Sequence, residues 1–331
     1  MRLAPEGTKV LALLSGGLDS TLAVKLMLDQ GMDVEALHFT TPFCLCDKCA
    51  VDDVGRRFGI RIHGVFLGRE YLDMVSNPPH GYGNQMNPCI DCRILMLRKA
   101  REIAIERGAI CIVTGEVLDE RPFSQRMAAM RIIEKEAGLE GKILRPLSAK
   151  LLPETEVERE GLIDRKRLFS IRGRRRLPQM RLAKEFGIHD YPCPSGGCLL
   201  TDPQFARRLR NFLEHGGKLT LKETALLRLG RHFRVEGSRI IVGRNEEENK
   251  RLLSVARREG KPYLEVAEYT GPITLLRGNE DERIVGKASQ ITVRYSDAPK
   301  DVEVEVRYTA KTTKTLKARA VTDREIERWR I

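Results

Sequence analysis

The stretch KVLALLSGGLDSTLAVKLML (residues 9–28) decides the fold. Its first six residues form an apolar run of the length typical of a buried strand. From Thr21 onward, apolar residues recur at helical spacing. Residues 15–20 therefore form a strand-to-helix turn, in which two glycines let a ligand approach the backbone and serine hydroxyls stand beside the free N–H groups of the helix start. The turn predicts an anion site without the lysine of a Walker loop.

The segments after this turn repeat the strand and helix alternation. Because parallel strands need helical crossovers, the pattern predicts an α/β fold with a doubly wound parallel sheet. A nucleotide would lie at the carboxyl ends of its strands. The further strands are expected at residues 34–39, 60–67, 109–113 and 143–147, with helices ending near 60, 104 and 138.

The sequence pattern changes after His215-Gly216-Gly217, where short β-rich runs replace the alternation of strands and helices. We expect a sheet domain over residues 1–150, a helical basic extension over 151–215 and a smaller α+β module over 216–331. The module's expected strands are 238–243, 263–267, 273–276, 290–295 and 302–308, and its expected helix is 246–258.

The composition favours a polyanionic partner. Lysine and arginine number 58 against 46 acidic residues, which gives a net charge of +12. The densest basic run, residues 171–176, leads into a helix over 178–186 and is a candidate for phosphate contacts, although a solvated basic face is the simpler reading. Aromatic residues are only 5% of the chain, so stacking on many unpaired bases is not expected.

The eight cysteines point to metal or sulfur chemistry. The apolar run after Lys9 is too short for a signal peptide or a membrane span, so we expect a cytoplasmic protein without membrane attachment and without structural disulfides. Cys89 and Cys92 form a CxxC at a helix start, and Cys198 lies in a Gly/Pro loop. Three thiolates suit a [4Fe-4S] cluster with one iron free, a persulfide pair, or zinc with a fourth ligand.

The other cysteines are assigned less directly. Cys44, Cys46 and Cys49 have metal-like spacing and form a possible second site. Cys193 is a candidate fourth zinc ligand, and Cys111, inside an apolar run, is expected in the core.

The motif SGGLDS (residues 15–20) is the S-G-G-x-D-S signature of the PP-loop ATP pyrophosphatases, and the sequence resembles that family. The resemblance implies that the loop holds the β- and γ-phosphates of ATP while an acceptor attacks the α-phosphorus, so that AMP is transferred and pyrophosphate leaves. Asp19 would act with Mg²⁺ at the leaving group.

Further motifs resemble the tRNA-thiolating branch of this family. NPCIDC (residues 87–92) is similar to the N-P-D-x-x-C of tRNA 2-thiouridylases, with Cys89 where that family often has aspartate. The segments 114–116, 124–125 and 145–150 resemble the T-G-E, S-Q and R-P-L-lysine motifs of tRNA 4-thiouridine synthetases. Residues 243–249 resemble the NFACT-R type of RNA-binding domain.

The resemblance carries roles over to individual residues. The catalytic set is Asp19, Lys150, Cys89, Cys92 and Cys198, and the last three also hold the metal. The nucleotide set is Ser15, Gly16, Gly17, Asp19, Ser20, His38, Thr114 and Gly115. The RNA-binding set is Arg172, Arg174, Arg175, Arg176 and Arg244.

The predicted function is ATP-dependent thiolation of tRNA. A uridine carbonyl oxygen is a poor leaving group until it is adenylated, and sulfur then displaces AMP. The sulfur donor would be sulfide or a persulfide from a desulfurase, and a homodimer is possible. Two alternatives stay open at this point: a PP-loop ligase that acts on a small molecule with structural zinc, and an RNA-binding protein without catalysis.

Overall fold

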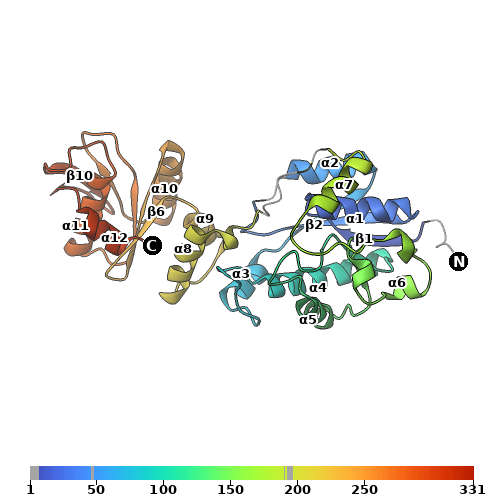
Figure 1. Ribbon diagram of the computed structural model, residues 1–331. Coiled ribbons are helices and arrows are strands. Elements are labelled where there is room, and N and C mark those ends of the chain that lie inside the picture. The colour runs from blue at the N-terminus through green and yellow to red at the C-terminus, as the bar shows by residue number, and fades with distance from the viewer. Residues whose placement is uncertain (1–6, 46–47, 190, 192–196) are drawn as a thin grey trace. The chain divides into compact units, whose positions relative to one another are not determined.

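The computed structural model describes residues 7–45, 48–189, 191 and 197–331 (Figure 1). The chain divides into two compact units, residues 1–202 and 203–331. The units separate after residue 202 rather than after 215, because helix α8 (Pro203–Glu214) buries Phe205 and Leu209 and packs against α9 (Leu221–Leu227). The functional division into 1–150, 151–215 and 216–331 stays a prediction.

The first unit is built on a five-stranded sheet in the order β3-β2-β1-β4-β5, in which every pair is parallel. This confirms the predicted fold class. The strands are β1 (Lys9–Leu13), β2 (Asp33–Thr40), β3 (Arg61–Phe66), β4 (Ile112–Thr114) and β5 (Ile143–Leu144). Since the chain moves from β1 toward β3 and then back to β4 on the other side, the order reverses at the carboxyl ends of β1 and β4, where such sheets bind ligands.

Helices cover both faces of this sheet, and β1 shows why. Val10 and Ala12 contribute to the core beneath α1, whereas Leu11 and Leu13 contribute to the core beneath α4 and α5. Figure 1 shows α1, α2 and α7 on one side of the sheet and α3, α4 and α5 on the other. The helices are α1 (Leu18–Asp29), α2 (Lys48–Phe58), α3 (Arg69–Ser76), α4 (Cys89–Arg107), α5 (Met127–Ala137), α6 (Glu156–Arg159) and α7 (Leu177–Glu185).

The second unit is an antiparallel sheet in the order β11-β10-β8-β9-β7-β6, with helices on both faces. Its strands are β6 (Arg231–Val235), β7 (Ser238–Val242), β8 (Tyr263–Val266), β9 (Thr274–Arg277), β10 (Val304–Thr309) and β11 (Thr313–Ala318). Its helices are α8, α9, α10 (Glu246–Glu259), α11 (Glu282–Arg294) and α12 (Asp323–Trp329).

One predicted strand is wrong. Residues 290–295 were expected to be extended because they are rich in β-branched residues, but they complete helix α11 and its C-cap. Asp281 caps this helix by accepting a hydrogen bond from the Ile284 amide at 2.8 Å. Ile284, Ala288 and Ile291 then recur at helical spacing and are buried, so packing overrides the local preference. Within the described residues, no helix is both long and apolar enough to cross a membrane.

Candidate active site

The turn between β1 and α1 is held by its own serines. The Ser15 and Ser20 hydroxyls lie 3.1 Å apart, and the Ser20 hydroxyl donates to the Gly17 carbonyl at 2.9 Å. Gly16 has φ +79°, and a Cβ there would lie 3.0 Å from a methyl group of Val51. Glycine is therefore required by both backbone conformation and space. The amides at the start of α1 lie at the switch point of the sheet, where they can bind phosphate.

Gly115, directly after β4, packs against this turn. A Cβ on Gly115 would lie 2.4 Å from the Asp19 carbonyl carbon and from the Ser20 nitrogen. Since backbone cannot move aside as a flexible side chain can, the second loop fits against the helix start only with glycine. The two predicted nucleotide motifs are therefore in direct contact.

A cavity of about 410 Å³ opens over these loops. It is large enough to take a sizeable part of a nucleotide. From the predicted nucleotide set it is lined by Ser15, Gly17, Asp19, Ser20, Thr114 and Gly115, and from the predicted metal set by Cys89, Cys92 and Cys198. One cavity in the first unit thus joins the phosphate loop to all three cysteines.

Asp19 projects into the cavity and forms an ion pair with Arg176. Arg176 Nε lies 3.7 Å from a carboxylate oxygen of Glu120. Burial, followed by the charge of Asp19, raises the pKa of Glu120. The buried Oδ1 of Asp19 accepts no hydrogen bond from the described residues, so one carboxylate oxygen is available to a ligand.

Thr114 and His38 contact residues beside the phosphate loop. The Thr114 hydroxyl donates to Glu116 at 3.3 Å. His38 is buried, and its Nδ1 lies 3.0 Å from the Leu14 carbonyl at the end of β1. His38 is not among the residues that line the cavity, so its contact supports the loop rather than a nucleotide.

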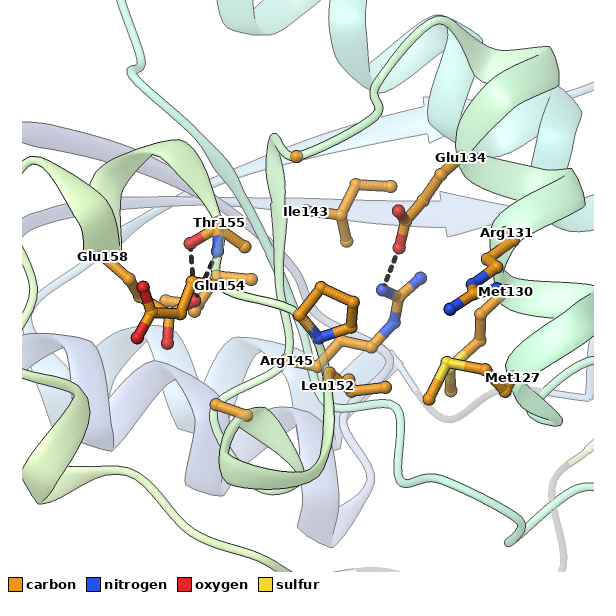
Figure 2. Close-up of a pocket in the computed structure, with 14 residues that line it drawn as sticks. Met127, Met130, Arg131, Glu134, Ile143, Arg145, Leu152, Glu154, Thr155 and Glu158 are labelled. Atoms are coloured by element: carbon orange, nitrogen blue, oxygen red, sulfur yellow. Dashed lines mark hydrogen bonds and ion pairs between the residues drawn. The ribbon is translucent and has the colours of Figure 1, made fainter.

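A buried ionic network forms one side of the cavity. Glu116 contacts Arg145 at 3.0 Å and Arg93 at 3.2 Å. Burial alone would raise the pKa of Glu116, but Arg93 and Arg145 more than offset this and hold it below its usual value. Figure 2 shows Arg145 continuing to Glu134 beside a small cavity of about 70 Å³, whose other wall includes the bonded pair Thr155 and Glu158.

Two of the three cysteines accept hydrogen bonds from side chains. Cys89 and Cys92 begin α4, where Asn87 Nδ2 donates to Cys89 Sγ at 3.1 Å and the buried Tyr71 hydroxyl donates to Cys92 Sγ at 3.3 Å. Such bonds orient sulfur ligands and tune their electronics. Burial raises the pKa of Cys92, and it raises the pKa of Cys198 to about 12.

Cys198 is positioned by pairing between two loops. The Leu45 amide donates to the Gly197 carbonyl at 2.6 Å, and the Leu199 amide donates to the Phe43 carbonyl at 3.0 Å. Cys44 faces Cys198 in this pairing and is in a disulfide, so the expectation that the chain has no disulfide is wrong for Cys44.

The remaining cysteines are in three situations. Cys111 is buried in the core as predicted, and burial raises its pKa to about 12. Cys46 and Cys193 lie outside the described residues, as does the side chain of Cys49. Over the part of the chain that is described, no three His, Cys, Asp or Glu side chains converge on a single metal position.

Comparison with known proteins finds a family similar to each of two parts of the chain. Residues 6–150 match the family "Thiamine biosynthesis protein (ThiI)", and residues 230–330 match the "NFACT protein RNA binding domain". These two segments are called the ThiI-type domain and the NFACT-type domain below, after the families that they resemble.

The chain is similar over part of its length to curated proteins. It is 26% identical to a tRNA-specific 2-thiouridylase of Marinobacter nauticus over 63% of this chain and 55% of that protein. It is 29% identical to a probable tRNA sulfurtransferase of Methanothermobacter thermautotrophicus over 66% of this chain and 52% of that protein. The chain thus spans about half the length of these relatives.

Among solved structures, a U34-tRNA thiolase of Methanococcus maripaludis with its [4Fe-4S] cluster is 20% identical. The alignment covers 68% of this chain and 73% of that chain, with a TM-score of 0.36.

The predicted RNA-binding arginines of the first unit do not form one surface. Arg174 and Arg175 are exposed, and Arg172 is exposed beside Asp119, to which its Nε donates at 2.6 Å. Arg176 instead points into the cavity of the ThiI-type domain. Arg176 thus lies apart from the exposed Arg174 and Arg175, and its role in RNA binding stays a prediction. Lys150, predicted as catalytic, is exposed outside the cavity and donates to the Lys166 carbonyl at 2.8 Å.

In the NFACT-type domain, the residues that carried the resemblance hold the fold. Asn245 caps α10 by accepting from the Glu248 amide at 2.9 Å, and Asn249 accepts from the Ile273 amide at 3.0 Å. Arg244 Nε lies 3.0 Å from Glu248, which places this predicted RNA contact in an ion pair at the start of α10.

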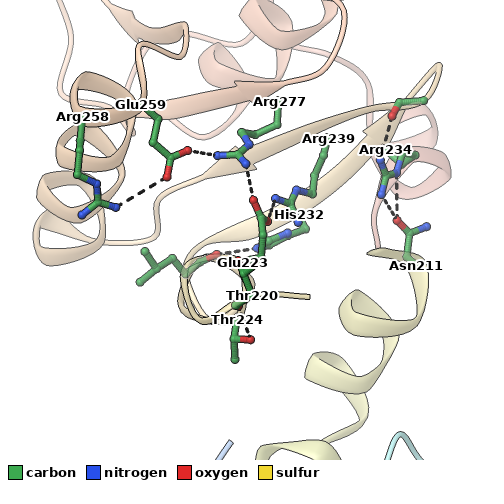
Figure 3. A network of polar contacts seen from close by, with 12 residues as sticks. Asn211, Thr220, Glu223, Thr224, His232, Arg234, Arg239, Arg258, Glu259 and Arg277 are labelled. Atoms are coloured by element: carbon green, nitrogen blue, oxygen red, sulfur yellow. Dashed lines mark hydrogen bonds and ion pairs between the residues drawn. The ribbon is translucent and has the colours of Figure 1, made fainter. Parts of the chain in front are cut away.

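The sheet of the NFACT-type domain also carries a buried ionic network. Figure 3 shows Glu223 of α9 between Arg239 of β7 and Arg277 of β9, with Glu259 on the far side of Arg277. Arg239 also stacks over Phe212, with its guanidinium 4.8 Å from the ring centre. These contacts tie α8, α9 and α10 to one face of the sheet.

Proposed function

We propose that this protein is an ATP-dependent tRNA thiolase. It would adenylate a uridine carbonyl oxygen, release pyrophosphate, and replace AMP with sulfur. One observation carries the proposal: a single cavity holds the PP-loop, an aspartate with an available carboxylate oxygen, and three cysteines. A small-molecule ligase with structural zinc would leave the NFACT-type domain unexplained, and a non-catalytic RNA-binding protein would leave the intact loop unexplained.

The loop and Asp19 account for the first step. The amides at the start of α1 would bind the β- and γ-phosphates, helped by the Ser15 and Ser20 hydroxyls. Asp19 would hold Mg²⁺ through its available Oδ1, because a lone carboxylate oxygen beside phosphates suits this cation. The acceptor oxygen attacks the α-phosphorus, the bond to the β-phosphate breaks, and pyrophosphate leaves with the electron pair.

The cysteines account for the second step. Cys89, Cys92 and Cys198 do not converge on one metal position among the described residues, but all three line the cavity and would hold a [4Fe-4S] cluster, which would supply the sulfur that replaces AMP. Iron would bind each of these cysteines as a thiolate, and the thiol proton would be released on binding. Asn87 and Tyr71 would orient two of the sulfurs through their hydrogen bonds.

The RNA substrate is inferred from three findings. The net charge is +12, residues 230–330 match an RNA-binding family, and the relatives named above act on tRNA. A reaction that uses ATP and tRNA also fits the expected cytoplasmic location. The sulfur source would be sulfide or a desulfurase persulfide, and a homodimer stays possible.

The proposed function is tested with anaerobically purified protein, unmodified tRNA, Mg²⁺, ATP and sulfide. We expect thiouridine in the digested tRNA by mass spectrometry, with one pyrophosphate released per thiouridine and no product when ATP is omitted. Pyrophosphate release that depends on a small acceptor rather than on tRNA would contradict the proposal.

The exposed arginines before α7 give a prediction about RNA affinity. The double variant Arg174→Gln/Arg175→Gln should bind tRNA more weakly, and the slope of log affinity against log salt should fall by about one unit for each lost phosphate contact. ATP affinity should not change, because neither side chain lines the cavity. The measurement is tRNA binding over a salt series.

The matched control removes the same charge elsewhere. Arg126 and Arg131 are both exposed on or next to α5, and the double variant Arg126→Gln/Arg131→Gln should keep the wild-type salt slope. If the Arg174/Arg175 variant also keeps that slope, these arginines only face solvent.

A further inference from the structure

We propose that Arg176 is a catalytic residue of ATP cleavage. It pairs with Asp19 in the nucleotide-free protein and binds the leaving pyrophosphate during adenylation. This inference rests on the proposed function. It gives Arg176 the role of catalytic cation, for which the sequence resemblance named Lys150.

The first argument is the bonding of the pair. Arg176 and Asp19 both line the cavity, and their side chains are 17% and 16% exposed. The buried Nε of Arg176 and the buried Oδ1 of Asp19 have no hydrogen-bond partner among the described residues. A pair that leaves a donor and an acceptor unused next to a phosphate loop is arranged for a further ligand.

The second argument is the supply of positive charge. The described cavity lining contains three cations, Arg93, Arg121 and Arg176. Arg93 is held by Glu116 at 3.2 Å, and Arg121 is exposed. Arg176 is less exposed than Arg121 and pairs with the aspartate of the phosphate loop, with Glu120 at 3.7 Å from its Nε. Its planar guanidinium can bind two phosphate oxygens at once, which an ammonium group cannot do.

The third argument is the rigidity of the backbone that carries Arg176. The Gly173 amide donates to the Leu118 carbonyl at 2.8 Å, and the Ile171 amide donates to the Leu147 carbonyl at 2.8 Å. The Ser148 hydroxyl, itself bonded to the Leu118 amide, donates to the Ile171 carbonyl at 2.7 Å. These bonds tie the segment to the loop after β4 and to the turn after β5. The distance from Arg176 to the phosphate loop is thus set by backbone contacts.

The reaction follows from an exchange of partners. When ATP binds, Arg176 turns from Asp19 to the β-phosphate, and Asp19, released from the guanidinium, would hold Mg²⁺. As the uridine oxygen bonds to the α-phosphorus, the bond from that phosphorus to the bridging oxygen breaks. The electron pair stays on pyrophosphate, where Arg176 offsets the new negative charge.

The test compares Arg176→Gln with Arg176→Lys, and uses Arg131→Gln as the control, because Arg131 is exposed on α5 and does not line this cavity. We expect Arg176→Gln to slow tRNA-dependent pyrophosphate release at saturating ATP by about a hundredfold or more, as when one transition-state donor is removed. Arg176→Lys should recover part of this rate. In calorimetry, inorganic pyrophosphate with Mg²⁺ should bind Arg176→Gln at least about tenfold more weakly than wild type, while tRNA affinity stays unchanged. Arg131→Gln should keep the wild-type rate of pyrophosphate release, pyrophosphate affinity and tRNA affinity.

Wild-type pyrophosphate release and binding in Arg176→Gln would overturn the proposal, as would a loss of tRNA affinity alone, because Arg176 would then belong to the RNA surface. A melting curve checks folding, and Arg176→Lys keeps the test decisive if Arg176→Gln unfolds. If wild type cleaves ATP without thiolating tRNA, the proposed function fails while the pyrophosphate binding of the variants still decides the role of Arg176. If wild type binds neither ATP nor pyrophosphate, both proposals fall.

Discussion

Asp19→Ala is expected to lower the rate of ATP-dependent pyrophosphate release by about a thousandfold or more, because the change removes both the proposed Mg²⁺ ligand and the partner of Arg176. The fold should persist. Asp19 lies at the cavity surface, so the stability loss should stay below the ~3–5 kcal/mol typical of breaking a fully buried ion pair. The measurements are pyrophosphate release with saturating tRNA and a urea unfolding curve.

Asp29→Ala is the matched control for this variant. Asp29 ends the same helix α1 and also forms an ion pair, with Lys25, but it lies far from the phosphate loop in sequence and does not line the cavity. It should keep wild-type turnover. Full turnover by folded Asp19→Ala protein would contradict the assignment of the PP-loop.

The second large effect concerns sulfur. Protein prepared without oxygen should be brown and contain about four irons and four sulfides, as a cubane cluster requires. Alanine at Cys89, Cys92 or Cys198 should remove both the colour and thiolation. Each of these sulfurs lines the same cavity as the phosphate loop, and a cluster held by two cysteines is more weakly bound. Iron analysis and the absorption spectrum provide a readout that is independent of activity.

Cys111→Ala provides the control, because Cys111 is buried in the core away from the cavity lining and should keep iron and activity. Thiolation by an iron-free anaerobic sample would instead support a persulfide on one of the cysteines. Zinc in place of iron, with activity lost on chelation, would mean that the cysteines only stabilise the loops.

The fold of the first unit could be predicted closely from its sequence, whereas the fold of the second unit could be predicted only in part. The run that became β1 is apolar from Val10 to Leu13 because both faces of that strand are covered, so its length and the glycines after it were sufficient for prediction. In the second unit, β11 carries mostly exposed residues and lacks an apolar pattern. Helix α11 was partly misassigned because its β-branched residues favour strands locally, and its register depends on the cap at Asp281.

The site divides in the same way. The phosphate loop, Gly115 and the three cysteines could be predicted because each belongs to a short local motif. Arg176, Glu120 and Tyr71 could not, because their roles depend on contacts between distant segments. Arg176 lies 157 positions from Asp19, and the only local signal was a run of arginines in which one side chain points inward. Glu120 carried a weak signal, as a carboxylate four residues after the T-G-E motif.

The contact of Gly115 with the backbone of Asp19 and Ser20 has a consequence for how this gene can vary. Any single-base change in the first two positions of a glycine codon introduces either a stop codon or an amino acid with a Cβ, and that atom would lie 2.4 Å from main-chain atoms of the phosphate loop. No nearby side chain can make room by changing its rotamer, since the obstructing atoms are backbone. In a population of variants, position 115 should therefore stay glycine even where the adjacent surface positions vary. A gene copy that has lost this glycine should encode a protein that no longer binds nucleotide.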